Sequence, residues 1–199
     1  MRVCNGKQEG TDHIHARRPG MKLETERLTL REMTPSDLPV LRGILQDDEV
    51  MYAYEGAFSN AEVESWLLKQ LGNYRAYGFG LWLVILKETG EAIGQCGLTM
   101  QDCAGRQALE IGYLFNKAYW HRGYATEAAV ACREYAFNTL GAAEVCSIIR
   151  DTNIPSQNVA RRNGMVCTGR FVKLYRGVEM PHFVFTVENP AVWPKPFTP

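Results

Sequence analysis

Residues Leu109–Phe137 read LEIGYLFNKAYWHRGYATEAAVACREYAF, and this stretch decides the fold. Large apolar side chains at alternate positions from Leu109 to Phe115 predict a β-strand. An Ala-rich segment without Gly or Pro runs from Ala125 to Leu140, and the glycine that follows it predicts the end of a long α-helix. A short loop of small residues joins the two elements.

The start of that helix is a candidate anion site. The first N–H groups of a helix have no partner within it, and the helix dipole places a partial positive charge there. Gly123 and Ala125 carry little or no side chain, so a phosphate could reach the backbone. Glu127 in the first turn must then point away from the ligand. Because the Walker and Rossmann patterns are both absent, a plain strand–turn–helix connection is an equal alternative for this segment alone.

The segment WHRGYATEA after the strand EIGY resembles the acetyl-CoA motif [QR]-x-x-G-x-[GA] of the GNAT N-acetyltransferase superfamily. Trp120 stands where Gln or Arg is usual. This departure, with the A-T-E-A continuation, resembles the branch that contains the Rim-type ribosomal-protein N-terminal acetyltransferases. A second segment, NIPSQN at 153–158 followed by ARRNGM at 160–165, resembles the family's N-x-x-S…[KR]-x-G-F, with Met165 in place of Phe. The resemblance covers roughly residues 23–187 and implies acetyl-CoA as the cofactor.

The overall composition limits the partners. The chain of 199 residues has 22 Lys+Arg and 22 Asp+Glu, so its zero net charge does not favour a nucleic acid or an anionic membrane as the main partner. The six Cys have neither C-x-x-C nor zinc-finger spacing, so we expect reduced thiols in a cytoplasmic protein and no metal site. The longest apolar run, Leu81–Leu86, is too short to span a bilayer.

We expect three parts: a mobile extension over residues 1–20, one acetyltransferase domain over 21–188 and a Pro-rich tail over 189–199. The predicted order, β-α-α-β-β-β-α-β-α-β-β, indicates an α+β fold with a mixed, mostly antiparallel sheet of about seven strands and about four helices. The strands Leu109–Phe115 and Glu144–Arg150 are expected to be parallel neighbours joined by a right-handed crossover. The resemblance implies that they splay apart around the cofactor. The other predicted strands cover 23–33, 81–87, 92–100, 167–175 and 178–187, the other predicted helices cover 34–46, 59–77 and 155–164, and 47–49 is expected to form an acidic bend.

The resemblance implies three groups of cofactor contacts. The loop residues would bind the pyrophosphate: Arg122, Gly123, Tyr124, Ala125 and Thr126. The main chain of Tyr113, Leu114 and Phe115 would bind the pantetheine arm as an added strand. The second segment would contribute Asn153, Ser156, Asn158 and Arg161. Turn and helix capping remain the alternative for Asn153 and Ser156, and a solvated helix face remains the alternative for Arg161.

Glu110 is the candidate base. It lies between Leu109 and Ile111, and the period of a strand places its side chain opposite theirs. A Glu in an apolar strand is costly when unpaired, so it either pairs with a basic residue or faces a wet cleft. In the resembled family a Glu at this place is a frequent base candidate; substrate binding and structural pairing are the alternatives. Many members have a Tyr acid after the next strand, which is missing here; Ser156 is the nearest hydroxyl, and protonation by solvent competes with it.

The acceptor site is expected between the loop after the first helix and the last hairpin. The candidates are Tyr52, Tyr54, Glu55, Trp82 and His182, because an acidic and aromatic lining suits a cationic amine. The predicted function is acetyl-CoA-dependent transfer to a primary amine, either a protein N-terminus or a small molecule such as an aminoglycoside or polyamine, by direct attack in a ternary complex. The alternative is a non-catalytic acyl-CoA-binding module. A homodimer through the last strands is a further hypothesis.

Overall fold

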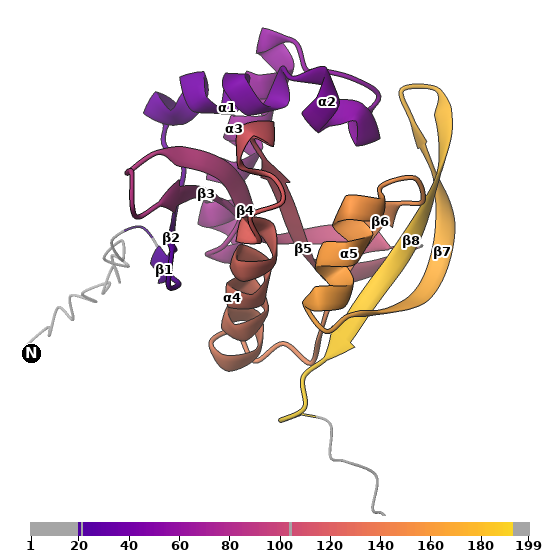
Figure 1. Ribbon diagram of the computed structural model, residues 1–199. Helices are drawn as coiled ribbons and strands as arrows, with labels where there is room; N and C mark the ends of the chain where they lie inside the picture. The colour runs from indigo at the N-terminus through magenta and orange to yellow at the C-terminus, as the bar shows by residue number, and fades with distance from the viewer. Residues whose placement is uncertain (1–19, 21, 104, 193–199) are drawn as a thin grey trace, which may run out of the picture.

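The computed structural model describes residues 20, 22–103 and 105–192 (Figure 1). The extension predicted over residues 1–20 therefore lies outside the described residues except for Gly20. Of the tail predicted over 189–199, only residues 189–192 are described. The described residues form one mixed sheet with helices packed against it.

The sheet has eight strands in the order β1-β2-β3-β4-β5-β6-β8-β7. Only the pair β5–β6 is parallel, so the predicted α+β fold with a mostly antiparallel sheet is confirmed. The strands are β1 (Lys22–Glu24), β2 (Leu28–Arg31), β3 (Leu81–Leu86), β4 (Ala92–Cys103), β5 (Arg106–Phe115), β6 (Glu144–Arg150), β7 (Val166–Tyr175) and β8 (Val178–Glu188). The prediction of about seven strands is low by one, because the first predicted strand breaks at a turn in which Thr25 N donates to Leu28 O.

Five α-helices occur in the described part of the chain, one more than about four. They are α1 (Leu38–Leu45), α2 (Asp48–Met51), α3 (Asn60–Tyr77), α4 (Tyr124–Asn138) and α5 (Ile154–Arg162), and the 3-10 turns are η1 (Pro35–Asp37), η2 (Tyr52–Tyr54) and η3 (Lys117–Tyr119). The extra helix, α2, replaces the acidic bend predicted at 47–49. The Asp47 side chain caps it by accepting from Glu49 N, and acidic residues in its first turn complement the helix dipole.

Two hydrophobic clusters lie on opposite faces of the sheet. One packs α4, through residues such as Ala128 and Cys132, against Ile111 and Phe115 of β5. The other packs α1 and α3 against β3 and includes Leu114 of β5. This alternation along β5 places Glu110, like Leu114, on the α1–α3 face. Alternate residues of β5 therefore belong to opposite faces of the sheet, with Ile111 and Phe115 on one face and Glu110 and Leu114 on the other.

The strands β5 and β6 separate soon after they meet. They share one register pair, Glu110 with Cys146, whereas β4 and β5 are paired along their whole length from Gly94–Phe115 to Cys103–Arg106. The predicted splaying of these two strands is therefore confirmed. Figure 1 shows α4 and α5 beside this region.

Candidate active site

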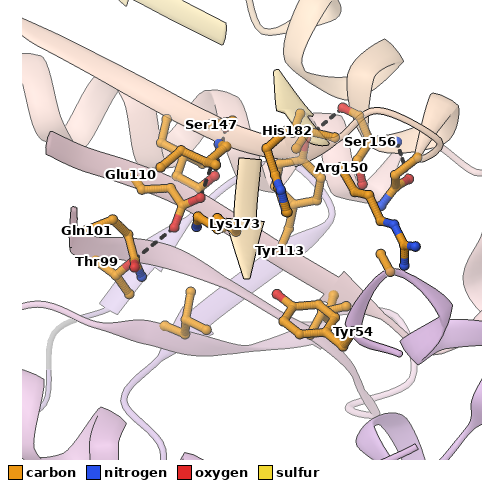
Figure 2. A pocket seen from close by; sticks show the side chains of 18 of the residues that line it. Tyr54, Thr99, Gln101, Glu110, Tyr113, Ser147, Arg150, Ser156, Lys173 and His182 are labelled. Carbon is orange, nitrogen blue, oxygen red and sulfur yellow. Dashed lines mark hydrogen bonds between the residues drawn. The ribbon is translucent and has the colours of Figure 1, made fainter. Parts of the chain in front are cut away.

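A cavity of about 410 Å³ lies where β5 and β6 separate. Tyr113, Asn153 and Ser156 line it on the side of α5. Glu110 and Tyr54 line it on the side of α3, and Figure 2 shows their side chains directed into it. The cavity therefore connects the two faces of the sheet through the gap between the strands.

Side chains satisfy the backbone groups that the separation leaves unpaired. Ser147 Oγ donates to Ile111 O at 2.8 Å, and Ile148 N donates to a carboxylate oxygen of Glu110 at 3.1 Å. Both bonds cross between β5 and β6 at the point where the strands part. They join β5 to β6 where the gap begins, and they satisfy polar groups that would cost free energy if they were buried without a partner.

Beyond these bonds, the main chain of Tyr113 faces the gap. Asn116 N donates to Ile93 O of the neighbouring chain segment, and in an antiparallel ladder such bonded positions alternate. Leu114 therefore directs its N–H and C=O towards β4, whereas Tyr113 directs its own towards β6. The C=O of Phe115 already accepts from Trp120 Nε1 at 2.8 Å. Of the three residues predicted to bind the pantetheine arm, Tyr113 therefore offers both backbone groups to the gap, while Leu114 lines the cavity with its backbone groups directed towards β4.

The loop before α4 has the features of an anion site. Gly123 has φ of 82° and is the N-cap of α4, a backbone conformation that favours glycine. Within the described residues, no group accepts a hydrogen bond from the N–H groups of 122–126. Tyr124 is buried in the core, so it can offer a ligand only its backbone. The predicted site therefore has its free donors in place.

Glu127 points away from this loop, as the anion hypothesis requires. Its carboxylate accepts from Thr25 Oγ1 at 2.5 Å, from Arg27 N at 2.9 Å and from Arg27 Nε at 2.6 Å. Burial acts to raise the pKa of this carboxyl, but the bonds from Thr25 and Arg27 outweigh burial and lower it. Glu127 therefore stays ionised and is held against the turn between β1 and β2, not against the loop.

Of the four cofactor-binding residues predicted in the segment 153–165, two line the cavity and two do not. Asn153 caps α5 by accepting from Ser156 N at 3.1 Å, which is the capping alternative, yet both residues also line the cavity. Ser156 O accepts from the Tyr113 hydroxyl at 2.8 Å and so joins α5 to β5. Asn158 and Arg161 bond to one another at 3.3 Å and do not line the cavity. Their contact with an outer part of the cofactor stays a prediction.

The acetyltransferase (GNAT) domain family matches residues 27–166 of the chain. The chain belongs to this family. It is 38% identical over 145 residues to the uncharacterized protein YkkB of Bacillus subtilis (strain 168), covering 72% of this chain and 84% of the relative. It is 32% identical over 154 residues to the uncharacterized N-acetyltransferase YnaD of the same organism, covering 77% and 87%. The fold is similar to that of RimL, a ribosomal L7/L12 alpha-N-protein acetyltransferase solved with coenzyme A, at a TM-score of 0.70 and 17% identity over 86% of this chain and 99% of that one.

In this GNAT domain, Glu110 is a half-buried carboxylate open to the cavity. Within the described residues it forms no ion pair, and its contacts are Ile148 N and the Thr99 hydroxyl at 3.4 Å. Burial raises its pKa above the usual value, and the nearby charge of Lys173 only partly opposes this. Of the two alternatives for a Glu in an apolar strand, the structure therefore shows the cleft and not the pair.

Two of the five predicted acceptor residues line the cavity, Tyr54 and His182. The Tyr54 hydroxyl has no hydrogen-bond partner among the described residues, and burial raises its pKa. His182 bonds through Nδ1 to Met180 O at 2.8 Å, and burial lowers its pKa, which favours the neutral ring. Both side chains therefore bring polar groups to the cavity, and their contact with an acceptor stays a prediction.

The prediction for Trp82 is wrong. Its side chain is fully buried and packs edge-on against Tyr135 of α4, with ring centroids 5.5 Å apart. Because β3 is apolar on both faces, its sequence does not show which face a given side chain takes. Trp82 takes the α4 face, whereas Leu81 borders the cavity.

Tyr52 and Glu55 lie beside the cavity without lining it. Glu55 forms an ion pair with Arg150 at 2.5 Å, and Arg150 also donates to Tyr52 O at 3.2 Å. These contacts fix the η2 segment to the end of β6. Contact of Tyr52 or Glu55 with an acceptor therefore stays a prediction.

The sequence reasoning missed several lining residues, of which Trp66, Lys69, Lys173 and Tyr175 matter most here. Trp66 and Lys69 are three residues apart on α3, and Lys173 and Tyr175 are two residues apart on β7, so each pair shares one face of its element. Sequence spacing can therefore predict that each pair shares a face. Only the fold shows that both pairs line the same cavity.

Over the described ranges, no three His, Cys, Asp or Glu side chains group together so that they could hold a metal ion. In the same part of the chain, no helix combines the length and apolar character needed to cross a membrane.

Proposed function

We propose that this GNAT domain transfers an acetyl group from acetyl-CoA to a primary amine by direct attack in a ternary complex. One observation carries the proposal: a single cavity leads from the free main chain of Tyr113 to the half-buried carboxylate of Glu110. A donor held on one side of the gap and an acceptor on the other would meet there. The family, the name of the relative YnaD and the coenzyme A bound to RimL support the same reaction.

The residues present fit the cofactor. The unpaired N–H groups of 122–126 suit its phosphates, and the backbone of Tyr113 suits the amides of the pantetheine arm. Acetyl-CoA supplies an activated thioester, whose carbonyl carbon accepts the amine. Gly123 keeps the loop open, because a side chain there would add bulk beside the free donors and would need an unfavourable backbone conformation.

Glu110 is the proposed base. An amine must lose a proton to attack, and a carboxyl with a raised pKa is a better acceptor for that proton than an ordinary one. In the proposed step, the C–N bond forms, the C–S bond breaks and the amine proton passes to Glu110, directly or through water. The leaving thiolate then takes a proton from Ser156 or from solvent. Ser156 borders the same cavity, and its role as the acid stays a prediction.

The proposal is tested by measuring CoA release from acetyl-CoA with a panel of amines. The panel contains peptide N-termini, amino acids, diamines and aminoglycosides. We expect release with at least one class, and a loss of about 100-fold in kcat/KM for Glu110→Gln. The matched control is Glu64→Gln, which changes an exposed Glu on α3 outside the cavity. Binding of acetyl-CoA without release for any amine would instead establish a non-catalytic module. The cytoplasmic location and the homodimer also stay predictions.

A further inference from the structure

The charges around the cavity are unbalanced. The charged side chains that line it are Glu110, Lys69, Lys173 and Arg150. Arg150 is neutralised by its ion pair with Glu55. In the described part of the chain, neither lysine has an ion-pair partner, and Glu110 lies in an ion pair with neither. Two unpaired cations therefore face one carboxylate.

This balance argues against a polycationic acceptor. A polyamine or an aminoglycoside would place one ammonium beside Glu110 and its remaining ammonium groups in a space lined by lysines. Like charges facing one another in an interface cost free energy and reject a ligand. The acceptor side therefore calls for an anionic group in addition to an amine.

The two lysines also limit how far apart these groups can be. Lys173 of β7 and Lys69 of α3 line the same cavity as Glu110, and the charge of each lysine acts to lower the pKa of that carboxyl. Figure 2 shows the side chain of Lys173 beside that of Glu110. An acceptor whose amine reaches Glu110 therefore has a lysine ammonium group nearby. An anionic group that pairs with this ammonium would lie a few bonds from the amine nitrogen of the acceptor.

Contacts of Arg176 also bridge the end of the cavity that is proposed to hold the acceptor. Arg176 at the turn between β7 and β8 forms an ion pair with Glu62 and donates to Glu55 O at 3.3 Å. Its guanidinium lies over the Phe58 ring, 5.5 Å from the centroid. These contacts tie the last hairpin across to the start of α3, where Phe58 borders the cavity. A bridged acceptor end favours a small molecule over the end of a folded protein.

We infer that the acceptor is a small amine that carries a carboxylate a few bonds from its nitrogen, as an amino acid does, with Lys173 and Lys69 binding the carboxylate while Glu110 receives the amine. This inference rests on the proposed function and specifies its substrate. The aromatic rings of Tyr54, Trp66 and Tyr175 would line the space left for the acceptor's side chain.

The test compares matched acceptors with the full-length protein and acetyl-CoA. Each amino acid is paired with its carboxamide, at concentrations corrected for the fraction of unprotonated amine, and a diamine and a neutral short peptide are added. We expect kcat/KM to be about tenfold higher for the carboxylate than for the carboxamide, since a charge-assisted bond is lost in the latter. Lys173→Met and Lys69→Met should each reduce this ratio and leave the KM for acetyl-CoA unchanged.

Arg170→Met is the matched control, because Arg170 is an exposed cation on the same strand as Lys173 and does not line this cavity. It should leave the ratio unchanged. CoA release with carboxamides, diamines or peptides at least as fast as with amino acids would overturn the inference and leave the proposed function standing. A preference for carboxylates that survives both lysine substitutions would also overturn it. Absence of release with every acceptor would refute the proposed function and this inference together.

Discussion

The carboxylate of Glu127 accepts a hydrogen bond from Arg27 Nε at 2.6 Å, across 100 residues of sequence. Arg27 in turn donates through Nη1 to Arg122 O at 3.1 Å and lies over the Tyr124 ring, 4.5 Å from its centroid. One arginine therefore fixes both the carbonyl that precedes Gly123 and the only acidic side chain in the first turn of α4. This network keeps a negative charge away from the predicted phosphate loop.

The first prediction concerns this network. In Arg27→Met, the Glu127 carboxylate loses its ion pair and the loop loses a contact at Arg122 O. We expect the KM for acetyl-CoA to rise about tenfold while kcat at saturation changes little, because the change acts on binding. Steady-state kinetics with varied acetyl-CoA measure both parameters.

Glu134→Gln is the control for this network, since Glu134 lies on the same helix and pairs at the surface with Arg133. It should leave the KM for acetyl-CoA unchanged. An unchanged KM in Arg27→Met, with the protein still folded, would show that the loop keeps its conformation without the arginine.

The second prediction concerns the activity of Glu110 as the pH changes. Burial raises its pKa above the ordinary 4.5, so the carboxyl remains protonated at a pH where an exposed Glu is already ionised. A base works only when deprotonated, so kcat/KM should rise with pH through this raised pKa. The pH profile of the wild type should therefore show an acid limb above 4.5. Glu110→Gln should remove that limb together with about 100-fold of the activity.

The third prediction concerns how Glu110 affects the stability of the folded protein as the pH changes. A group whose pKa is raised by folding stabilises the folded state below its unfolded pKa, and this contribution is lost as the pH rises through the folded value. Relative to Glu110→Gln, the wild type should therefore lose melting temperature between a pH near the ordinary value of 4.5 and a neutral pH above it. The glutamine keeps an oxygen that can accept from Ile148 N, so the substitution retains the contact at the gap. Thermal unfolding of both proteins at the two pH values measures this. A wild type that gains stability relative to the variant as the pH rises would contradict the prediction.

Much of this arrangement could be predicted from local sequence. The alternation in β5 predicts the strand and the separate face of Glu110, and Ser59 with Glu62 predicts the capped start of α3, which the structure shows. The four-residue helix α2 is too short to give a periodic signal. Trp82 was misplaced for a different reason: an apolar strand covered on both faces carries no alternation.

Lys173 and Lys69, which line the cavity, illustrate what sequence cannot show. Lys173 lies in a strand with alternating exposure, where a lysine is usually a solvated residue, and Lys69 lies on the polar part of a helix. Their importance comes from the fold, because the bridge at Arg176 brings the hairpin over α3. Charges that meet only through tertiary contacts have no sequence spacing by which they could be recognised.

The fourth prediction concerns the Tyr54 hydroxyl, which has no partner among the described residues and points into the cavity (Figure 2). In Tyr54→Phe the ring keeps its edge-on contacts with Phe58 and Trp66, at centroid distances of 6.1 Å each, so the fold should remain intact. Tyr54 is half-buried and its hydroxyl opens on the cavity, so the substitution removes no hydrogen bond within the described residues and the melting temperature should change little. If this hydroxyl binds the acceptor, the KM for the amine should rise about tenfold, while the KM for acetyl-CoA stays constant. Equal KM values for the amine in both proteins would place the acceptor elsewhere in the cavity, away from Tyr54.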